Sequence, residues 1–284
     1  MQELDARAES LLAALKADSR SGATQLALNT LDQLLSYLDE VEPEGETFLR
    51  LLAELRAARP SMIVIGNALA MIEQRLSSDV QVTRQAVMDI RYQLENATGT
   101  IARQALDLLP ESPVILTHSA SSAVLALFRN MAEQRQAFSV ICTQSSPGFE
   151  GHSLARALNE LAIPVTLITD AQMGLFVPQA DLVITGCDTW LSNGHFINKS
   201  GTHLLALAAH AAGKPLWVLA DSFRNSDADP GSVELEEMPA EELNAPPGDW
   251  ITPRNIYFER VPHALVSKRI SELGVFSCPA EPRR

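Results

Sequence analysis

The sequence predicts an α/β protein in which an all-α helical domain over residues 1–110 precedes a mostly parallel β-sheet, with an inserted β-hairpin, over residues 111–284. Three observations lead to this prediction. The first part has the periodicity of helices, the second alternates short β-branched runs with helical segments, and one Asn-Gly pair interrupts that alternation. A regular alternation of strands and helices builds a parallel sheet with helices on its faces.

The first 110 residues show almost only helical signals. Leucines recur at spacings of three and four residues at Leu11, Leu12 and Leu15, and again between Leu28 and Leu38. The acidic stretch 40–46 and the step at 59–61, where a proline suits a helix start, are the expected breaks. Residues 78–109 leave room for one long helix, so this part is predicted to be a helical bundle.

The period changes at Pro113. Six short runs rich in β-branched residues are expected strands, at 114–117, 138–143, 164–169, 181–185, 215–220 and 255–258. Helical segments such as 121–135 and 151–161 separate most of them. Asn193-Gly194, between residues 189–191 and 195–197, is the strongest short-range hairpin signal and predicts a hairpin within the α/β alternation. The polar, acidic and proline-rich stretch 225–249 is predicted to be a solvated surface excursion.

Composition excludes several classes of protein. The 284 residues carry 22 Lys and Arg against 35 Asp and Glu, a net charge of −13, which disfavours direct binding of nucleic acid. The 3 cysteines form no C-x-x-C pair and no histidine lies at zinc-ligand spacing, so neither a disulfide framework nor a metal site is expected. Neither a secretory signal nor a membrane span is predicted, and we expect a cytoplasmic protein without a cofactor.

Polar residues follow each of the first five expected strands. In an open parallel sheet the ligand binds outside the carboxyl ends of the strands, so these residues are candidates for a site. They are residues 117–119, 144–147, Asp170, 186–188 and 221–222. Helices that begin near Gly151 and near residues 201–202 would present free backbone N–H groups, and Lys199 comes just before the second. The pattern predicts a pocket for an anionic ligand.

The string GCDTWLSNGHFINKSGT, residues 186–202, resembles a family signature, G-A-D-x(4)-N-G-x(3)-N-K-x-G-T. The signature is shared by the alpha, beta and delta subunits of translation initiation factor 2B, archaeal ribose-1,5-bisphosphate isomerase and methylthioribose-1-phosphate isomerase. Further matching segments, which fall in the family's order, are residues 58–61, 117–118, 146–147, 163–170 and 255–262. The resemblance extends over roughly residues 50 to 278.

The resemblance implies a helical N-terminal domain packed on a Rossmann-like domain. It also implies a homodimer or larger assembly, and a sugar-phosphate or nucleotide site between the two domains. The isomerase members convert an aldose 1-phosphate to a ketose, with a cysteine and an aspartate as proton-transfer groups. Asp188 matches the aspartate, whereas Ser119 stands at the cysteine position, and an unactivated hydroxyl does not exchange protons near neutral pH as a thiol can.

The resemblance also defines the candidate ligand-binding residues. The family's E-[ST]-R-P string reads Gln-Ser-Ser-Pro at 144–147, so Ser146 replaces the arginine that is associated with the phosphate. Arg59 is expected to reach the phosphate from the helical domain. The expected catalytic residues are Asp188 and Ser119, and the expected ligand-binding residues are Arg59, His118, Ser146, Asn198, Lys199, Gly201 and Thr202.

Two functions remain open at this point. The first is a protein that binds a phosphorylated sugar or nucleotide and isomerises an aldose to a ketose, with Asp188 as acid or base. The second is a non-catalytic regulatory or scaffolding subunit that senses a phosphorylated metabolite. The losses at positions 119 and 146 favour the second function, and the intact Asn-Lys-x-Gly-Thr string favours retention of a ligand in either case.

Overall fold

A computed structural model describes residues 4–18, 22–41, 43, 45–59, 62–229, 231, 233, 235 and 237–278. The expected helix start at Pro60-Ser61 and two residues of the acidic break, Glu42 and Glu44, lie outside these residues. So do four residues of the surface excursion, Pro230, Ser232, Glu234 and Glu236. The chain forms two compact units, Met1–Ala97 and Thr98–Arg284, and the division falls within one long helix, α5 (Val80–Leu106).

The first unit consists of helices, as predicted. Its members are α1 (Ala6–Ala17), α2 (Ala23–Val41), α3 (Gly45–Ala58), α4 (Ile63–Glu73) and the first part of α5. Leu11, Leu15, Leu31 and Leu34 are buried, in agreement with the helical spacing of the leucines. Asp5 caps α1 by accepting hydrogen bonds from the backbone N–H groups of the first turn.

The second unit contains a seven-stranded sheet in the order β11-β10-β7-β4-β1-β2-β3. All neighbours are parallel except β10 and β11. The strands are β1 (Val114–Thr117), β2 (Ser139–Thr143), β3 (Val165–Ile168), β4 (Leu182–Thr185), β7 (Leu216–Leu219), β10 (Lys268–Ser271) and β11 (Gly274–Ser277). The first five expected strands therefore form, while no local pattern in the sequence predicted β10 and β11.

Helices cover both faces of this sheet. Alternate side chains of β4 point to opposite faces: Leu182 and Ile184 join one apolar cluster and Val183 joins the other. The first cluster contains residues of α6 (Ser122–Glu133) and α7 (Glu150–Glu160) and of the end of α5. The second contains residues of α8 (Met173–Phe176) and α9 (Thr202–Ala211). This layering leaves the loops after the strands to form a rim at the carboxyl edge of the sheet.

A second sheet has four strands in the order β8-β5-β6-β9. The predicted hairpin forms its centre, where β5 (Thr189–Leu191) pairs antiparallel with β6 (His195–Lys199) across a turn with Gly194 at φ +91°. The expected strand at 255–258 is wrong as placed. The strand there, β9 (Phe258–Pro262), begins at Phe258, and it pairs antiparallel with β6. Only an isolated bridge between Ile256 and Glu237 precedes it.

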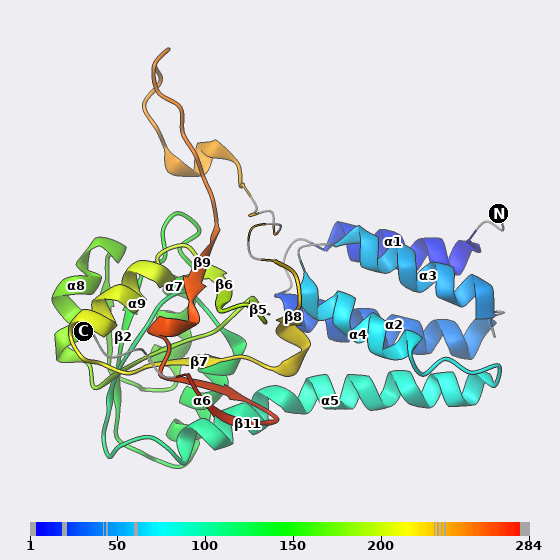
Figure 1. The fold of residues 1–284 in the computed structure, drawn as a ribbon, viewed down its shortest axis with the longest axis horizontal. Helices are drawn as coiled ribbons and strands as arrows, with labels where there is room; N and C mark the ends of the chain where they lie inside the picture. The colour runs from blue at the N-terminus through cyan, green and yellow to red at the C-terminus, as the bar shows by residue number, and fades with distance from the viewer. Residues whose placement is uncertain are drawn as a thin grey trace. The chain divides into compact units, whose positions relative to one another are not determined.

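The stretch between β7 and β9 forms the predicted surface excursion. It begins with a short 3-10 turn, η3 (Ser222–Arg224), and the two-residue strand β8 (Asn225–Ser226). Its far part, drawn in orange in Figure 1, extends away from the sheets and contains the almost fully exposed Trp250. Its base is fixed by the buried Asn255, whose amide donates to Pro239 O and to the carboxylate of Glu242 on η4 (Ala240–Leu243).

Candidate functional site

The end of β2 and the loops that follow β1, β2 and β3 are joined by hydrogen bonds, and they are here called the β1–β3 rim (residues 118–119, 143–146 and 170). His118 is buried, with Nδ1 2.6 Å from Thr143 Oγ1 and Nε2 2.8 Å from Ser200 O. Ser145 Oγ lies 3.1 Å from Thr143 Oγ1 and accepts a hydrogen bond from the backbone N–H of Ser119 at 2.8 Å. These contacts form one continuous chain of hydrogen bonds.

The donor and acceptor of each hydrogen bond in this series follow from the groups at its two ends, Ser200 O and Ser119 N–H. A carbonyl oxygen only accepts, so Nε2 of His118 carries the proton and Nδ1 accepts from Thr143. Thr143 Oγ1 has a single hydrogen and donates it to Nδ1, so it accepts from Ser145 Oγ, which itself accepts from Ser119 N–H. Burial lowers the pKa of His118, against the opposing hydrogen bond to Ser200, which keeps the ring neutral as this chain requires. Neither nitrogen of His118 is left to act as a base on the Ser119 hydroxyl.

Asp170 closes the β1–β3 rim. Its Oδ1 accepts from Ser145 N at 2.9 Å and its Oδ2 from Ser146 N at 2.7 Å. Ser119 and Ser145 both adopt positive φ, 64° and 60°, and Ser146 is exposed. At the position where the resemblance implies a phosphate arginine, the loop offers the small hydroxymethyl group of Ser146, which carries no charge.

The loops after β4, β6 and β7, here called the β4–β7 rim (residues 185–188, 198–202 and 220–224), hold the candidate Asp188. Its side chain is 43% exposed, and its Oδ1 lies 4.0 Å from Arg224 Nη1. Arg224 in turn donates from Nε to Asp221 Oδ2 at 3.0 Å. The surrounding protein raises the pKa of Asp188, and Arg224 and Lys199 oppose this rise. A carboxyl whose pKa is raised while its side chain stays accessible is able to exchange a proton with a bound molecule.

Cys187, which precedes Asp188, is buried, and burial raises the pKa of its thiol above the usual range. Cys187 is thus a core residue and no substitute for the cysteine that Ser119 replaces.

Lys199 is enclosed by side chains of this chain. Its Nζ lies 2.7 Å from Glu150 Oε1 and 3.4 Å from the centroid of the Tyr257 ring, and its side chain is only 4% exposed. Tyr257 donates its hydroxyl proton to Glu242, which fixes the ring. The cation that was expected to face a ligand is therefore already paired with a carboxylate.

The start of α9 differs from the expectation of free N–H groups. Glu259 Oε1, on β9, accepts from Gly201 N at 2.6 Å and from His203 N at 2.8 Å, so a carboxylate of the chain caps this helix. Asn198 and Thr202 are buried and bond to each other at 2.9 Å. Gly201 has φ +105°, and a Cβ there would lie 2.8 Å from the His118 ring. In the structure these three residues shape the turn that presents Lys199.

Arg59 belongs to the first unit. Its guanidinium donates to the carbonyls of Leu15 and Lys16 at 3.2 Å and to that of Asp18. These carbonyls end α1, where a cation is electrostatically favourable.

Three residues of this region were not among the candidates: Glu150, Tyr257 and Glu259. Glu150 begins α7, directly before Gly151, whose Cβ would lie 1.8 Å from Thr143 O. Gly151 marks an expected helix start, and this signal would also have identified the acid beside it, Glu150. Tyr257 and Glu259 lie within the matching stretch 255–262, but nothing local to them indicates that they reach Lys199 and α9.

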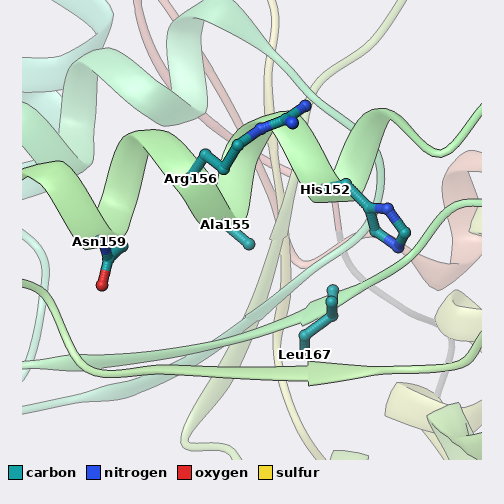
Figure 2. A pocket seen from close by; sticks show the side chains of 5 residues that line it. All are labelled: His152, Ala155, Arg156, Asn159 and Leu167. Carbon is teal, nitrogen blue, oxygen red and sulfur yellow. The ribbon is translucent and has the colours of Figure 1, made fainter.

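A shallow groove elsewhere on this unit is lined by His152, Ala155, Arg156, Asn159 and Leu167 (Figure 2). It lies between α7 and the edge strand β3 and contains none of the candidate residues. Among the described residues there is no group of three potential metal ligands. The helices of the described chain include none that is long and apolar enough to cross a membrane.

Comparisons with known proteins agree with the fold. The family model described as the Initiation factor 2 subunit family matches residues 19–278. A putative translation initiation factor eIF-2B subunit 2-like protein from Pyrococcus horikoshii is 32% identical over 281 residues, covering 98% of this chain and 99% of the relative. The ribose 1,5-bisphosphate isomerase of Archaeoglobus fulgidus is 30% identical over 264 residues, covering 89% and 84%. The crystal structure of the Pyrococcus horikoshii OT3 translation initiation factor eIF-2B has a TM-score of 0.83 at 31% identity, covering 99% of each chain.

Proposed function

The chain belongs to the Initiation factor 2 subunit family, and we propose that it is a non-catalytic member that binds a phosphorylated sugar or nucleotide in the recess around Asp188. In this proposal the ligand regulates a subunit that has a regulatory or scaffolding role. A sugar-phosphate isomerase is the second candidate. The two share the same ligand chemistry and differ in whether a bound ligand is converted.

The observation that carries the proposal is the state of His118 beside Ser119. Both ring nitrogens are committed, to Thr143 Oγ1 and Ser200 O, and the ring is buried. His118 is therefore not available as a base for Ser119, and a hydroxyl with its ordinary high pKa does not take part in proton transfer without a base. Asp188 would have to perform both proton transfers of an isomerisation without a second group.

Binding of a ligand is supported by the β4–β7 rim. Asp188 is accessible there, and the positive charges of Arg224 and Lys199 stabilise its carboxylate. A carboxylate beside two cations suits a sugar that carries both hydroxyl donors and phosphate oxygens. One relative is named for ribose 1,5-bisphosphate, which makes this compound the first ligand to test.

One observation favours the isomerase. The pKa of Asp188 is raised while its carboxyl stays accessible, and this combination is typical of acids and bases that work near neutral pH. An isomerase would use Asp188 to move a proton between adjacent sugar carbons.

Phosphorus NMR of the full chain with ribose 1,5-bisphosphate, methylthioribose 1-phosphate and nucleoside monophosphates separates the two functions. We expect line broadening of at least one ligand and no new signal. Asp188→Asn should change the affinity, and Glu160→Gln, at the exposed end of α7, should not. A ketose phosphate signal that disappears in Asp188→Asn would establish the isomerase instead. The absence of any broadening would contradict both candidates.

The variant Ser119→Cys also distinguishes the non-catalytic protein from the isomerase, because it restores the thiol of the isomerases. If only the thiol is missing, restoring it should produce turnover. We expect none, because the phosphate arginine is also replaced, by Ser146, and because His118 remains committed. Turnover in Ser119→Cys that Asp188→Asn abolishes would show that the site is an isomerase site altered at one position.

The remaining parts of the proposal follow from the family. We propose a cytoplasmic homo-oligomer, a dimer or larger, whose partners are copies of itself and whose ligand is the phosphorylated metabolite. The role proposed for Arg59 in holding the phosphate requires its guanidinium to leave the carbonyls at the end of α1.

A further inference from the structure

We propose that Glu150 competes with anionic ligands for Lys199 and so sets how tightly the recess binds a phosphate group. Its carboxylate is paired with the ammonium group of Lys199. A phosphate group that binds Lys199 must therefore displace Glu150. The inference deepens the proposed function, on which it rests for the phosphorylated nature of the ligand.

The contact between Lys199 and Glu150 is the first step. At 2.7 Å the pair makes a charge-assisted hydrogen bond, and the lysine side chain is only 4% exposed. A phosphate that reached this ammonium with Glu150 in place would meet a carboxylate within a few ångströms. Two anions on one cation repel strongly in a partly desolvated recess. Binding of a phosphate and the present position of Glu150 therefore exclude each other.

Of the two groups that enclose Lys199, Glu150 is the one free to leave. Tyr257 is held by its hydroxyl on Glu242, and its carbonyl accepts from Ser200 N at 2.8 Å. Glu150 is 31% exposed and begins a helix after an exposed loop. In the described part of the chain its second oxygen, Oε2, is buried without a hydrogen-bond partner, which makes the present position costly.

The charges around Lys199 decide what the exchange costs. Both Lys199 and Glu150 act electrostatically on Asp188, and the second cation near Asp188, Arg224, is paired with Asp221. With Glu150 in place, both cations are therefore already paired with carboxylates of the chain. With Glu150 displaced, the recess gains a cation for one phosphate group. A ligand must then offer enough contacts to offset the lost ion pair, which favours sugar phosphates over free inorganic phosphate.

The test is the affinity of the full chain for inorganic phosphate, followed by phosphorus NMR, and for ribose 1,5-bisphosphate, followed by calorimetry. Glu150→Gln keeps the shape of the side chain and removes its charge. We expect it to bind both anions on the order of tenfold more tightly than the wild type, the scale on which close charge pairs alter binding. Glu150→Gln with Lys199→Met should lose this gain, and Glu160→Gln, on the same helix, should match the wild type.

The outcomes separate this inference from the proposed function. If the wild type binds no phosphorylated ligand but Glu150→Gln gains a phosphate site that needs Lys199, Glu150 is the competing group and the proposed function fails. If Glu150→Gln binds inorganic phosphate no better than the wild type, the inference is overturned whatever the wild type binds. Glu150→Ala, which removes the same charge, repeats the test if the glutamine variant does not fold.

Discussion

The β1–β3 rim and the β4–β7 rim lie at the same edge of one parallel sheet, and they hold their polar groups in different ways. In the first, each of the groups His118, Thr143, Ser145 and Asp170 bonds another part of the rim or of the chain. In the second, Asp188 is 43% exposed and has a cation only at 4.0 Å, and buried oxygens of Thr185 and Asp221 lack partners within the described residues.

The difference indicates where chemistry can occur. A buried polar network in which every member is satisfied is rigid, and a change in any member costs stability. Groups that lack a partner are the ones available to a ligand. The β1–β3 rim is therefore a scaffold, and Asp188 is the group of the β4–β7 rim that a ligand is able to reach.

The largest effect should come from Gly151, where α7 packs against the end of β2. A Cβ at this position would lie 1.8 Å from Thr143 O, a backbone atom that cannot rotate away. We expect Gly151→Ala to lower the free energy of unfolding by about 3 kcal/mol or more, since overpacking against backbone forces the helix to shift. Urea denaturation measures it, with Gly174→Ala, which meets no atom within 4 Å, as the control. Equal losses in both variants would contradict the close packing.

The two rims are compared directly by neutralising one carboxylate in each, Asp170 and Asp188, and measuring the free energy of unfolding. Asp170 accepts from two backbone N–H groups, so Asp170→Asn should lower the free energy of unfolding by about 2 kcal/mol, because one charge-assisted bond is replaced by an opposed pair of donors. Folding raises the pKa of Asp188, which means that it disfavours the charged form. Asp188→Asn should therefore leave stability at pH 7 unchanged or slightly raise it. A large loss in Asp188→Asn would remove the distinction between the rims.

The sequence predicted the scaffold better than the site, for a physical reason. Strands such as β1 and β4 are short β-branched runs, and the β5–β6 hairpin is specified by Asn193-Gly194, so their signals are local. β9 is polar and ends in Pro262, and it owes its place to pairing with β6, about 60 residues away. Its start was therefore misplaced.

The same limit applies to the contacts of the site. The signature predicted that Asp188 and Lys199 share one site, and in the structure Lys199, at the end of β6, acts electrostatically on Asp188. Glu150 on Lys199 and Glu259 on the start of α9 are contacts across 49 and 58 residues of sequence. A helix start or a lysine in a motif predicts an affinity for anions. It does not reveal that a carboxylate distant in the sequence already binds the lysine or the helix start.

Acid should weaken the second sheet through His263, which stacks on Trp190 at 3.8 Å. Burial lowers its pKa to about 4, so the unfolded chain binds the proton more readily. This contribution is complete above about pH 6.5 and is lost as the pH falls toward 4. After allowance for partial exposure, we expect about 1–2 kcal/mol of acid-linked loss that His263→Phe, which keeps the stack, does not show. Parallel pH profiles of the two proteins, from urea denaturation, would contradict the assignment.

The smallest effect on stability is expected at Ser119. It distinguishes Ser119 from Ser145, whose hydroxyl is part of the hydrogen-bond network. The Ser119 backbone N–H donates to Ser145 Oγ, whereas within the described residues the Ser119 hydroxyl makes no hydrogen bond. Ser119→Ala should therefore change the free energy of unfolding by less than about 0.5 kcal/mol. Ser145→Ala removes the middle of the hydrogen-bond chain and leaves Ser119 N–H without its acceptor, at a cost of about 1–2 kcal/mol. Equal losses in the two variants would mean that the Ser119 hydroxyl is held as firmly as the rest of the β1–β3 rim, and the hydroxyl would then no longer be available to a ligand.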